Sequence, residues 1–71
     1  MHLEELIHII KERRRILDIT QEDLSELSGI GLRTVKAIES GKSNPTFDTI
    51  NKLISVLGLD LKLEVKKPEI R

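Results

Sequence analysis

The spacing of apolar residues divides this chain into a long helical part and one short segment of a different kind. From residue 3 to residue 57, apolar side chains recur every three or four positions, which is the repeat of a helix face. Residues 59–66 instead alternate strictly between apolar and charged side chains, as in a half-buried strand. The sequence therefore predicts an all-α domain over 1–58, one β-strand over 59–67 and a charged tail over 68–71.

Glycines and capping residues divide the helical part into four segments. Thr20 and Thr46 are suited to cap the N-termini of two of them, and Asp23 completes a capping box with Thr20. Gly29 and Gly41 are suited to the left-handed conformation that ends a helix. We therefore predict helices over residues 3–17, 21–28, 32–40 and 47–57. Their inward faces include Leu3, Leu6, Ile7, Ile10, Arg14, Leu17, Leu24, Leu27, Val35, Ile38, Phe47, Ile50, Leu53, Ile54 and Leu57.

The composition excludes several classes of function. The chain has no cysteine and a single aromatic residue, Phe47, which excludes disulfide staples, thiolate chemistry and stacked aromatic platforms for single-stranded nucleic acid. No apolar run is longer than two residues, so we expect no membrane span or secretory signal and a cytoplasmic location. Twelve basic residues balance twelve acidic ones, so any contact with nucleic acid must be local.

The sequence offers neither a catalytic nor a cofactor site. His2 and His8 are six residues apart and lie on different sides of the first helix, so no metal ligand is expected. The serines have no nearby histidine, and a domain this small has little room for a cleft with facing carboxylates. We expect a protein that is not an enzyme.

The segment from Thr20 to Asn44, TQEDLSELSGIGLRTVKAIESGKSN, contains two short helices joined by a glycine-containing turn. Such a pair can place its second helix in the major groove of DNA. Here the chain resembles the lambda-repressor/Cro-like (XRE) helix-turn-helix family over about residues 6–58. The resemblance is carried by Thr20-Gln21, Leu24, Gly29-Ile30, Ile38-Glu39-Ser40-Gly41, Pro45, Lys52-Leu53 and Leu57-Gly58.

The resemblance implies a sequence-specific regulator of double-stranded DNA, a repressor that binds a palindromic operator as a homodimer. It implies that Gln21 touches the DNA backbone and braces the recognition helix. Leu32, Arg33 and Lys36 would face base edges and Thr34 a flanking phosphate, while phosphate contacts would come from Ser40, Lys42 and Ser43. The family commonly pairs an arginine with a glutamate at the positions of Arg14 and Glu39. Leu32 and Ser25 depart from the polar and the small apolar residue usual at their positions.

The predicted strand indicates a dimer, because its backbone groups need a partner that no other segment of this chain supplies. Ile9 and Ile16 form a second apolar stripe on the first helix, which either broadens the core contact or meets a second subunit. The expected interface is therefore formed by Leu59, Leu61, Leu63 and Val65, with Ile9 and Ile16 beneath them. The strand also resembles that of HipB-like antitoxins, which neutralise a partner toxin and repress their own operon. A repressor, an antitoxin and a protein-interaction adaptor without DNA binding all remain open.

Charge sets the expected register of the strand pair. In a two-fold antiparallel pair, facing residues have numbers with a constant sum, and that sum must be even if facing side chains share one face. Centring the pair on Leu63 opposes Lys62 to Glu64 and Asp60 to Lys66. Centring it on Lys62 or Glu64 opposes like charges, which is unfavourable. The sequence therefore predicts a pair in which Leu63 faces its own copy and Leu61 faces Val65.

Overall fold

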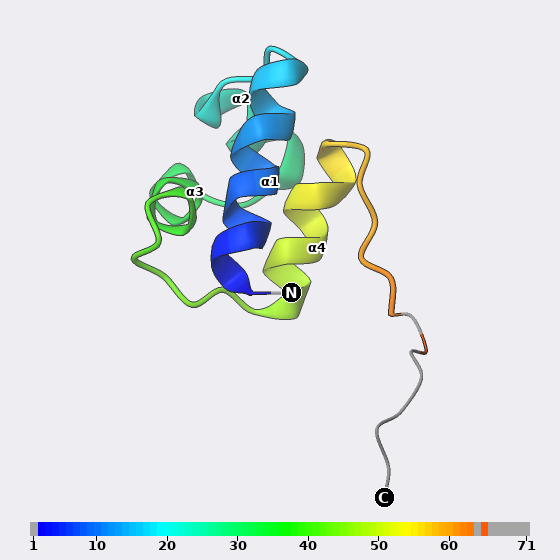
Figure 1. The fold of residues 1–71 in the computed structure, drawn as a ribbon. Helices are drawn as coiled ribbons and strands as arrows, with labels where there is room; N and C mark the ends of the chain where they lie inside the picture. Colours follow the sequence, from blue (N-terminus) through cyan, green and yellow to red (C-terminus); the bar gives the residue numbers. More distant parts are fainter. Residues whose placement is uncertain (1, 64, 66–71) are drawn as a thin grey trace, which may run out of the picture.

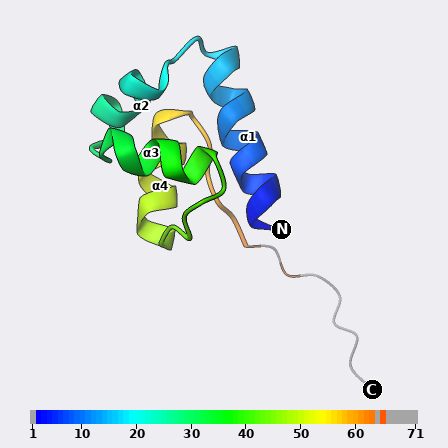
Figure 2. The ribbon, with the colours of Figure 1, turned by 90° about the vertical axis from the view of Figure 1, so that its left-hand side faces the viewer.

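The described part of the chain folds into four α-helices, as its sequence predicts. The computed structural model describes residues 2–63 and 65. Its helices are α1 (Leu3–Ile16), α2 (Gln21–Ser28), α3 (Leu32–Glu39) and α4 (Phe47–Val56). α1 and α4 lie beside each other, and α3 lies to one side of both (Figure 1). Seen from that side, α3 crosses in front of α4 (Figure 2).

One aliphatic core joins all four helices. α2 packs against α3 and α4, and α1 packs against α3. The buried apolar residues come from every helix and from the end of α4: Ile7, Ile10, Leu24, Val35, Ile38, Ile50, Leu53, Ile54 and Leu57. Ile30, in the turn between α2 and α3, packs against this cluster, as do Leu3 and Leu6. Helical periodicity alone thus identified nearly the whole core.

The helix ends show how the chain turns between elements. Thr20 accepts a hydrogen bond from the backbone N–H of Asp23 in a complete capping box, and Thr46 accepts one from that of Thr49. After α3, the N–H of Lys42 donates to the carbonyl of Ala37, and the same pattern joins Leu59 to Ile54 and Ile19 to Arg14. Glycine occupies the left-handed position of this motif at residues 41 and 58, whereas α1 places Asp18 there, with φ of 58°.

Three residues predicted to face the core are exposed instead. Leu17 is 40% exposed, Leu27 64% and Phe47 70%. Leu27 and Phe47 lie in terminal turns of α2 and α4, and Leu17 follows the last residue of α1. The apolar repeat therefore continues at helix ends that are not buried. Ile19 and Ile30 pack against the core just after the ends of α1 and α2. They provide the apolar contacts that Leu17 and Leu27 were expected to make. The first buried residue of α4 is Ile50, one turn after Phe47.

The segment after α4 is only partly packed. Leu59 and Leu61 lie against the core, while Leu63 and Val65 are fully exposed. Residues 2–63 and 65 contain no β-strand, since a single chain provides no partner strand, and the paired strand stays a prediction. Glu64, Lys66 and the tail over 68–71 lie outside the described residues. Within the described chain, no helix is both long and apolar enough to cross a membrane.

Candidate nucleic-acid interface

The turn between α2 and α3 is held by two serine side chains. The hydroxyl of Ser25 donates to the carbonyl of Ile30 at 2.6 Å, and the hydroxyl of Ser28 accepts from the N–H of Ile30 at 3.1 Å. Both backbone polar groups of the residue that enters the core are therefore bound to α2. Ser25, which departs from the family pattern, has a structural role in this chain.

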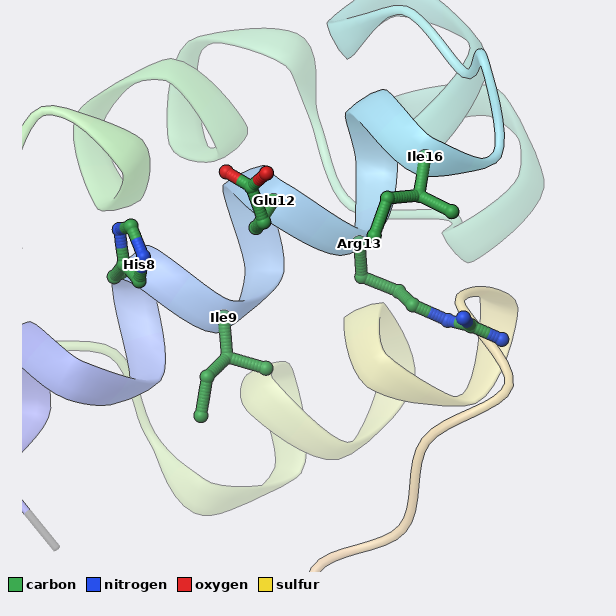
Figure 3. A pocket seen from close by; sticks show the side chains of 5 residues that line it. All are labelled: His8, Ile9, Glu12, Arg13 and Ile16. Carbon is green, nitrogen blue, oxygen red and sulfur yellow. The ribbon is translucent and has the colours of Figure 1, made fainter.

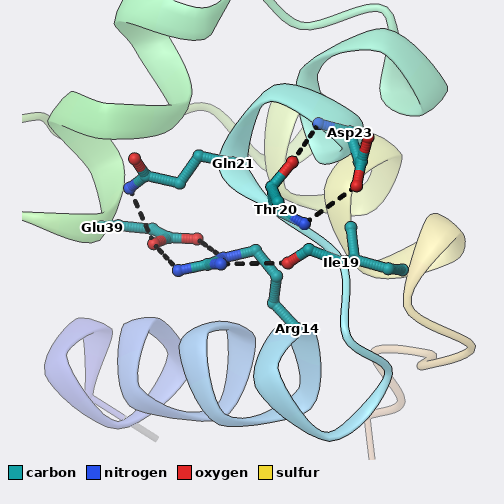
Figure 4. Close-up of polar contacts among 6 residues, drawn as sticks. All are labelled: Arg14, Ile19, Thr20, Gln21, Asp23 and Glu39. Carbon is teal, nitrogen blue, oxygen red and sulfur yellow. Dashed lines mark hydrogen bonds and ion pairs between the residues drawn. The ribbon is translucent and has the colours of Figure 1, made fainter.

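A buried polar network fixes α2 and α3 relative to α1 (Figure 4). The guanidinium of Arg14 donates to both carboxylate oxygens of Glu39, from Nε at 2.8 Å and from Nη2 at 2.9 Å. The side-chain amide of Gln21 donates to the same carboxylate at 3.0 Å, and Arg14 also donates to the carbonyl of Ile19. The three side chains come from three different helices, so the network ties the start of α2 to the end of α3.

The network is shielded from water and fully satisfied. The side chain of Glu39 is 4% exposed and that of Arg14 17%. No buried side-chain nitrogen or oxygen among the described residues lacks a hydrogen-bond partner. The hydrogen bond to Glu39 is the main reason why the pKa of Arg14 is raised above its ordinary value. Because the raised pKa lies far above neutrality, the guanidinium stays charged at neutral pH.

The outer face of α3 presents Arg33 and Lys36, two of the three predicted base-contacting residues, to solvent, together with Thr34, which is predicted to face a phosphate. Arg33, Thr34 and Lys36 are exposed, and Leu32 is half-buried at the first turn. Val35 and Ile38 point the opposite way and are fully buried. The helix therefore separates an apolar inner face from a polar outer one, and Figure 2 looks onto the side of the molecule where it lies.

The predicted phosphate-contacting residues follow the end of α3. Ser40 is exposed and its hydroxyl donates to the carbonyl of Ala37 at 3.0 Å. Lys42 is exposed in the following turn, and Ser43 is half-buried beside it. Gln21 is half-buried at the start of α2. The structure thus groups Gln21 with Arg14 and Glu39. A separate exposed set on α3 and after it consists of Arg33, Thr34, Lys36, Ser40 and Lys42.

Burial of Glu39 gives this surface its charge. Between Leu32 and Thr46 the charged residues are Arg33, Lys36, Lys42 and Glu39. The three basic side chains are exposed, and the single acidic one is buried against Arg14. The neighbouring helix α2 carries three acidic residues and no basic one. A chain with no net charge therefore displays a local positive surface on α3 and the turn after it.

Ile9 and Ile16 line a hollow to which no described residue of the C-terminal segment contributes. They are 37% and 65% exposed and line a shallow hollow along α1 with His8, Glu12 and Arg13 (Figure 3). Leu61 and Leu63 line a different hollow, with Phe47 and Lys62. Within one chain, these predicted interface residues therefore line two hollows.

Sequence reasoning missed contacts that depend on tertiary proximity. Arg13 extends from α1 to the end of α4 and its Nε donates to the carbonyl of Leu57 at 2.9 Å, visible in Figure 3 as the side chain beside the turn after α4. An arginine on a helix face gives no sequence signal for such a contact. The serine contacts to Ile30 had a weak signal, because Ser25 already departed from the family pattern.

Comparisons with known proteins agree with this architecture. The family model described as Helix-turn-helix matches residues 10–63. An uncharacterized HTH-type transcriptional regulator of Haemophilus influenzae is 37% identical over 60 residues, which cover 80% of this chain and 61% of that protein. One from Methanothermobacter thermautotrophicus is 34% identical over 50 residues, covering 70% and 72%.

The match also extends to longer proteins. The HTH-type transcriptional regulator PuuR of Escherichia coli is 33% identical over 60 residues, which cover 84% of this chain and 32% of PuuR. No solved structure matches with comparable significance. The matched residues include α2, the turn and α3, where the serine turn, the buried network and the basic surface are found. The chain belongs to the XRE-like helix-turn-helix family of DNA-binding proteins.

Proposed function

We propose that this protein is a sequence-specific regulator of transcription that binds double-stranded DNA through α3. The observation that carries the proposal is the charge of that surface: Arg33, Lys36 and Lys42 are exposed, while Glu39 is buried. Positive charge on an exposed helix face attracts the phosphate backbone, and the major groove of DNA is wide enough for an α-helix. Regulator names among the relatives support the same function.

Each residue of the surface has a role in the proposal. Arg33 donates to O6 and N7 of a guanine, because its forked donors match those acceptors, and Leu32 meets a thymine methyl group. Lys36 faces the base edges beside them. Phosphate contacts come from Gln21, Thr34, Ser40, Lys42 and Ser43. The side-chain amide of Gln21 donates one hydrogen to Glu39. Its contact to a phosphate therefore comes from the second amide hydrogen or from its backbone N–H at the N-terminus of α2.

The active form in this proposal is a homodimer on a palindromic operator, where it represses by excluding polymerase. The two copies pair through residues 59–66 in the register that places Leu63 opposite itself. Exposure of Leu63 and Val65 in the single chain supports this pairing, because both belong to the apolar row of the predicted strand.

Selection of bound DNA from a random pool tests the function. We expect enrichment of two inverted half-sites with centres about one helical turn apart or a multiple of it. Enrichment of single sites without an inverted partner would contradict the dimer. A chain that enriches no sequence would contradict DNA recognition and favour the adaptor function. An antitoxin would select DNA in the same way and would also bind the protein encoded beside it.

A further inference from the structure

Phe47 is a large apolar residue that lies mostly in solvent. It is the only aromatic residue in the sequence and 70% of it is exposed, at the first turn of α4. It lines one hollow with Leu61, Lys62 and Leu63. In the segment after α4, the side chains of Leu63 and Val65 are fully exposed. An aromatic ring next to an exposed aliphatic row marks a contact surface.

The charges of residues 59–66 indicate which molecule covers this contact surface. With Leu63 on a two-fold axis, each charged residue of the row meets an opposite charge: Lys62 meets Glu64, and Asp60 meets Lys66. The segment is therefore complementary to a second copy of itself. In that register Leu61 faces Val65 of the second copy, with Cβ atoms about 5 Å apart.

We infer that Phe47 anchors the dimer by packing against Val65 of the second copy. Phe47 shares a hollow with Leu61, and Leu61 faces Val65 of the second copy, so the ring reaches that valine across the interface. The inference rests on the proposed dimer and adds α4 to an interface that otherwise consists of the strand alone. Ile9 and Ile16, the other residues expected at the interface, line a different hollow.

The anchor connects the dimer to the DNA-binding surface. Phe47 begins α4, and the loop before it carries Lys42 and Ser43 from the end of α3. Holding Phe47 at the interface would fix where this loop enters α4 in both copies. The spacing between the two α3 helices would then depend on Phe47 as well as on the paired strands.

A tryptophan reporter tests the assignment, because the chain has no native tryptophan or tyrosine. We expect the emission of the Phe47→Trp protein to shift to shorter wavelength as concentration rises through dimer formation measured by sedimentation. An indole that leaves water for an apolar contact emits at shorter wavelength. Leu27→Trp is the matched control, since Leu27 is 64% exposed and lies on α2, and its emission should stay constant.

Chemical cross-linking identifies the partner residue, because the chain has no native cysteine. We mix a tagged Phe47→Cys protein with an untagged Val65→Cys protein and add a short bismaleimide. We expect a covalent tagged–untagged dimer, and none when Leu27→Cys replaces Phe47→Cys. A mixture that dimerises without this product, and without the tryptophan shift, overturns the role of Phe47.

A second cysteine variant separates this inference from the proposed dimer. Leu63→Cys should form a disulfide with its own copy, because residue 63 lies on the axis. Formation of that disulfide without the Phe47–Val65 product overturns the anchor and leaves the strand pair standing. Absence of both products overturns the strand register, and with it the dimer proposed for DNA binding.

Discussion

The α2–α3 unit and the segment after α4 differ in how far one chain satisfies their polar groups and buries their apolar side chains. In the α2–α3 unit the turn residue Ile30 has both backbone groups bound, and the buried carboxylate of Glu39 accepts from two side chains. In the C-terminal segment Leu63 and Val65 leave their whole side chains in water. The α2–α3 unit satisfies its polar groups within a single chain, whereas the described part of the C-terminal segment exposes apolar side chains.

This difference separates two requirements of the proposed regulator. The shape of the DNA-reading helix pair must exist before DNA arrives, so its contacts lie within one chain. The distance between two recognition helices is a property of a dimer, so its contacts remain open in one chain. Substitutions in the two regions should therefore change different quantities: stability of the monomer in the first, and association and DNA affinity in the second.

The largest expected effect is on the buried network. Arg14→Ala should lower the free energy of unfolding by about 3–5 kcal/mol, because it leaves the carboxylate of Glu39 buried without its ionic partner. The denaturant midpoint measures the loss. Arg15→Ala is the control, because Arg15 is 67% exposed and its pair with Glu12 should contribute less than about 1 kcal/mol. If Arg14→Ala lost no more than the small amount expected for Arg15→Ala, the stability of the helix pair would not depend on the network.

The open segment should respond in association rather than in folding. Leu63→Asp should leave the thermal transition of the monomer unchanged, because the side chain of Leu63 is fully exposed. It should abolish the dimer, because two carboxylates would face each other at the axis. Loss of bivalent binding should weaken operator affinity by about 100-fold or more, measured by mobility shift. A variant that stays dimeric would disprove the register.

Base readout by α3 should show as a change of preference. Arg33→Ala should relax selection at one base pair per half-site and cost about 1–3 kcal/mol there. The monomer should keep its stability, because Arg33 is exposed and outside the buried network. Binding to the selected operator and to single-base variants measures the effect. Uniform weakening of all sequences would assign Arg33 to phosphate instead.

The turn after α3 should show its role in salt dependence. Lys42→Ala in both subunits should flatten the slope of log affinity against log salt by about 2, since each neutralised phosphate contributes roughly 0.9. Only the side chain is removed, so the backbone hydrogen bond from residue 42 to Ala37 stays. Lys52→Ala, which disrupts an exposed pair with Asp48 on α4, provides a control with an unchanged slope. An unchanged slope for Lys42→Ala would remove it from the phosphate contacts.

The smallest expected effect concerns a strained point in the otherwise complete helical region. Asp18 has φ of 58°, where a side chain other than glycine costs about 1–2 kcal/mol. Asp18→Gly should raise the free energy of unfolding by about 0.5 kcal/mol after the extra chain entropy of glycine is subtracted. Thermal unfolding measures the gain. A clear loss would show that the carboxylate of Asp18 makes a contribution that outweighs the strain.

Much of the fold could be predicted from the sequence because it depends on local rules. The four helices were predicted from apolar spacing and from Thr20, Thr46 and the glycines, and each ends within one residue of its expected position. The left-handed turn after α1 was not predicted, since Asp18 forms it and not the glycine that usually occupies such a position. The same rules placed Leu17, Leu27 and Phe47 in the core, because periodicity does not show where neighbouring helices stop.

The candidate site divides in the same way. Sequence alone determined the outward position of Arg33 and Lys36, since a helix with Val35 and Ile38 buried must turn those residues to solvent. Leu32, which was expected to face outward with them, is half-buried. Tertiary structure decided which groups meet across helices: Gln21 with Glu39, Ser25 with Ile30, and Arg13 with the carbonyl of Leu57. These contacts join residues from different elements, and their geometry depends on how the helices pack. A helical repeat specifies the faces of each helix, but only packing brings two faces together.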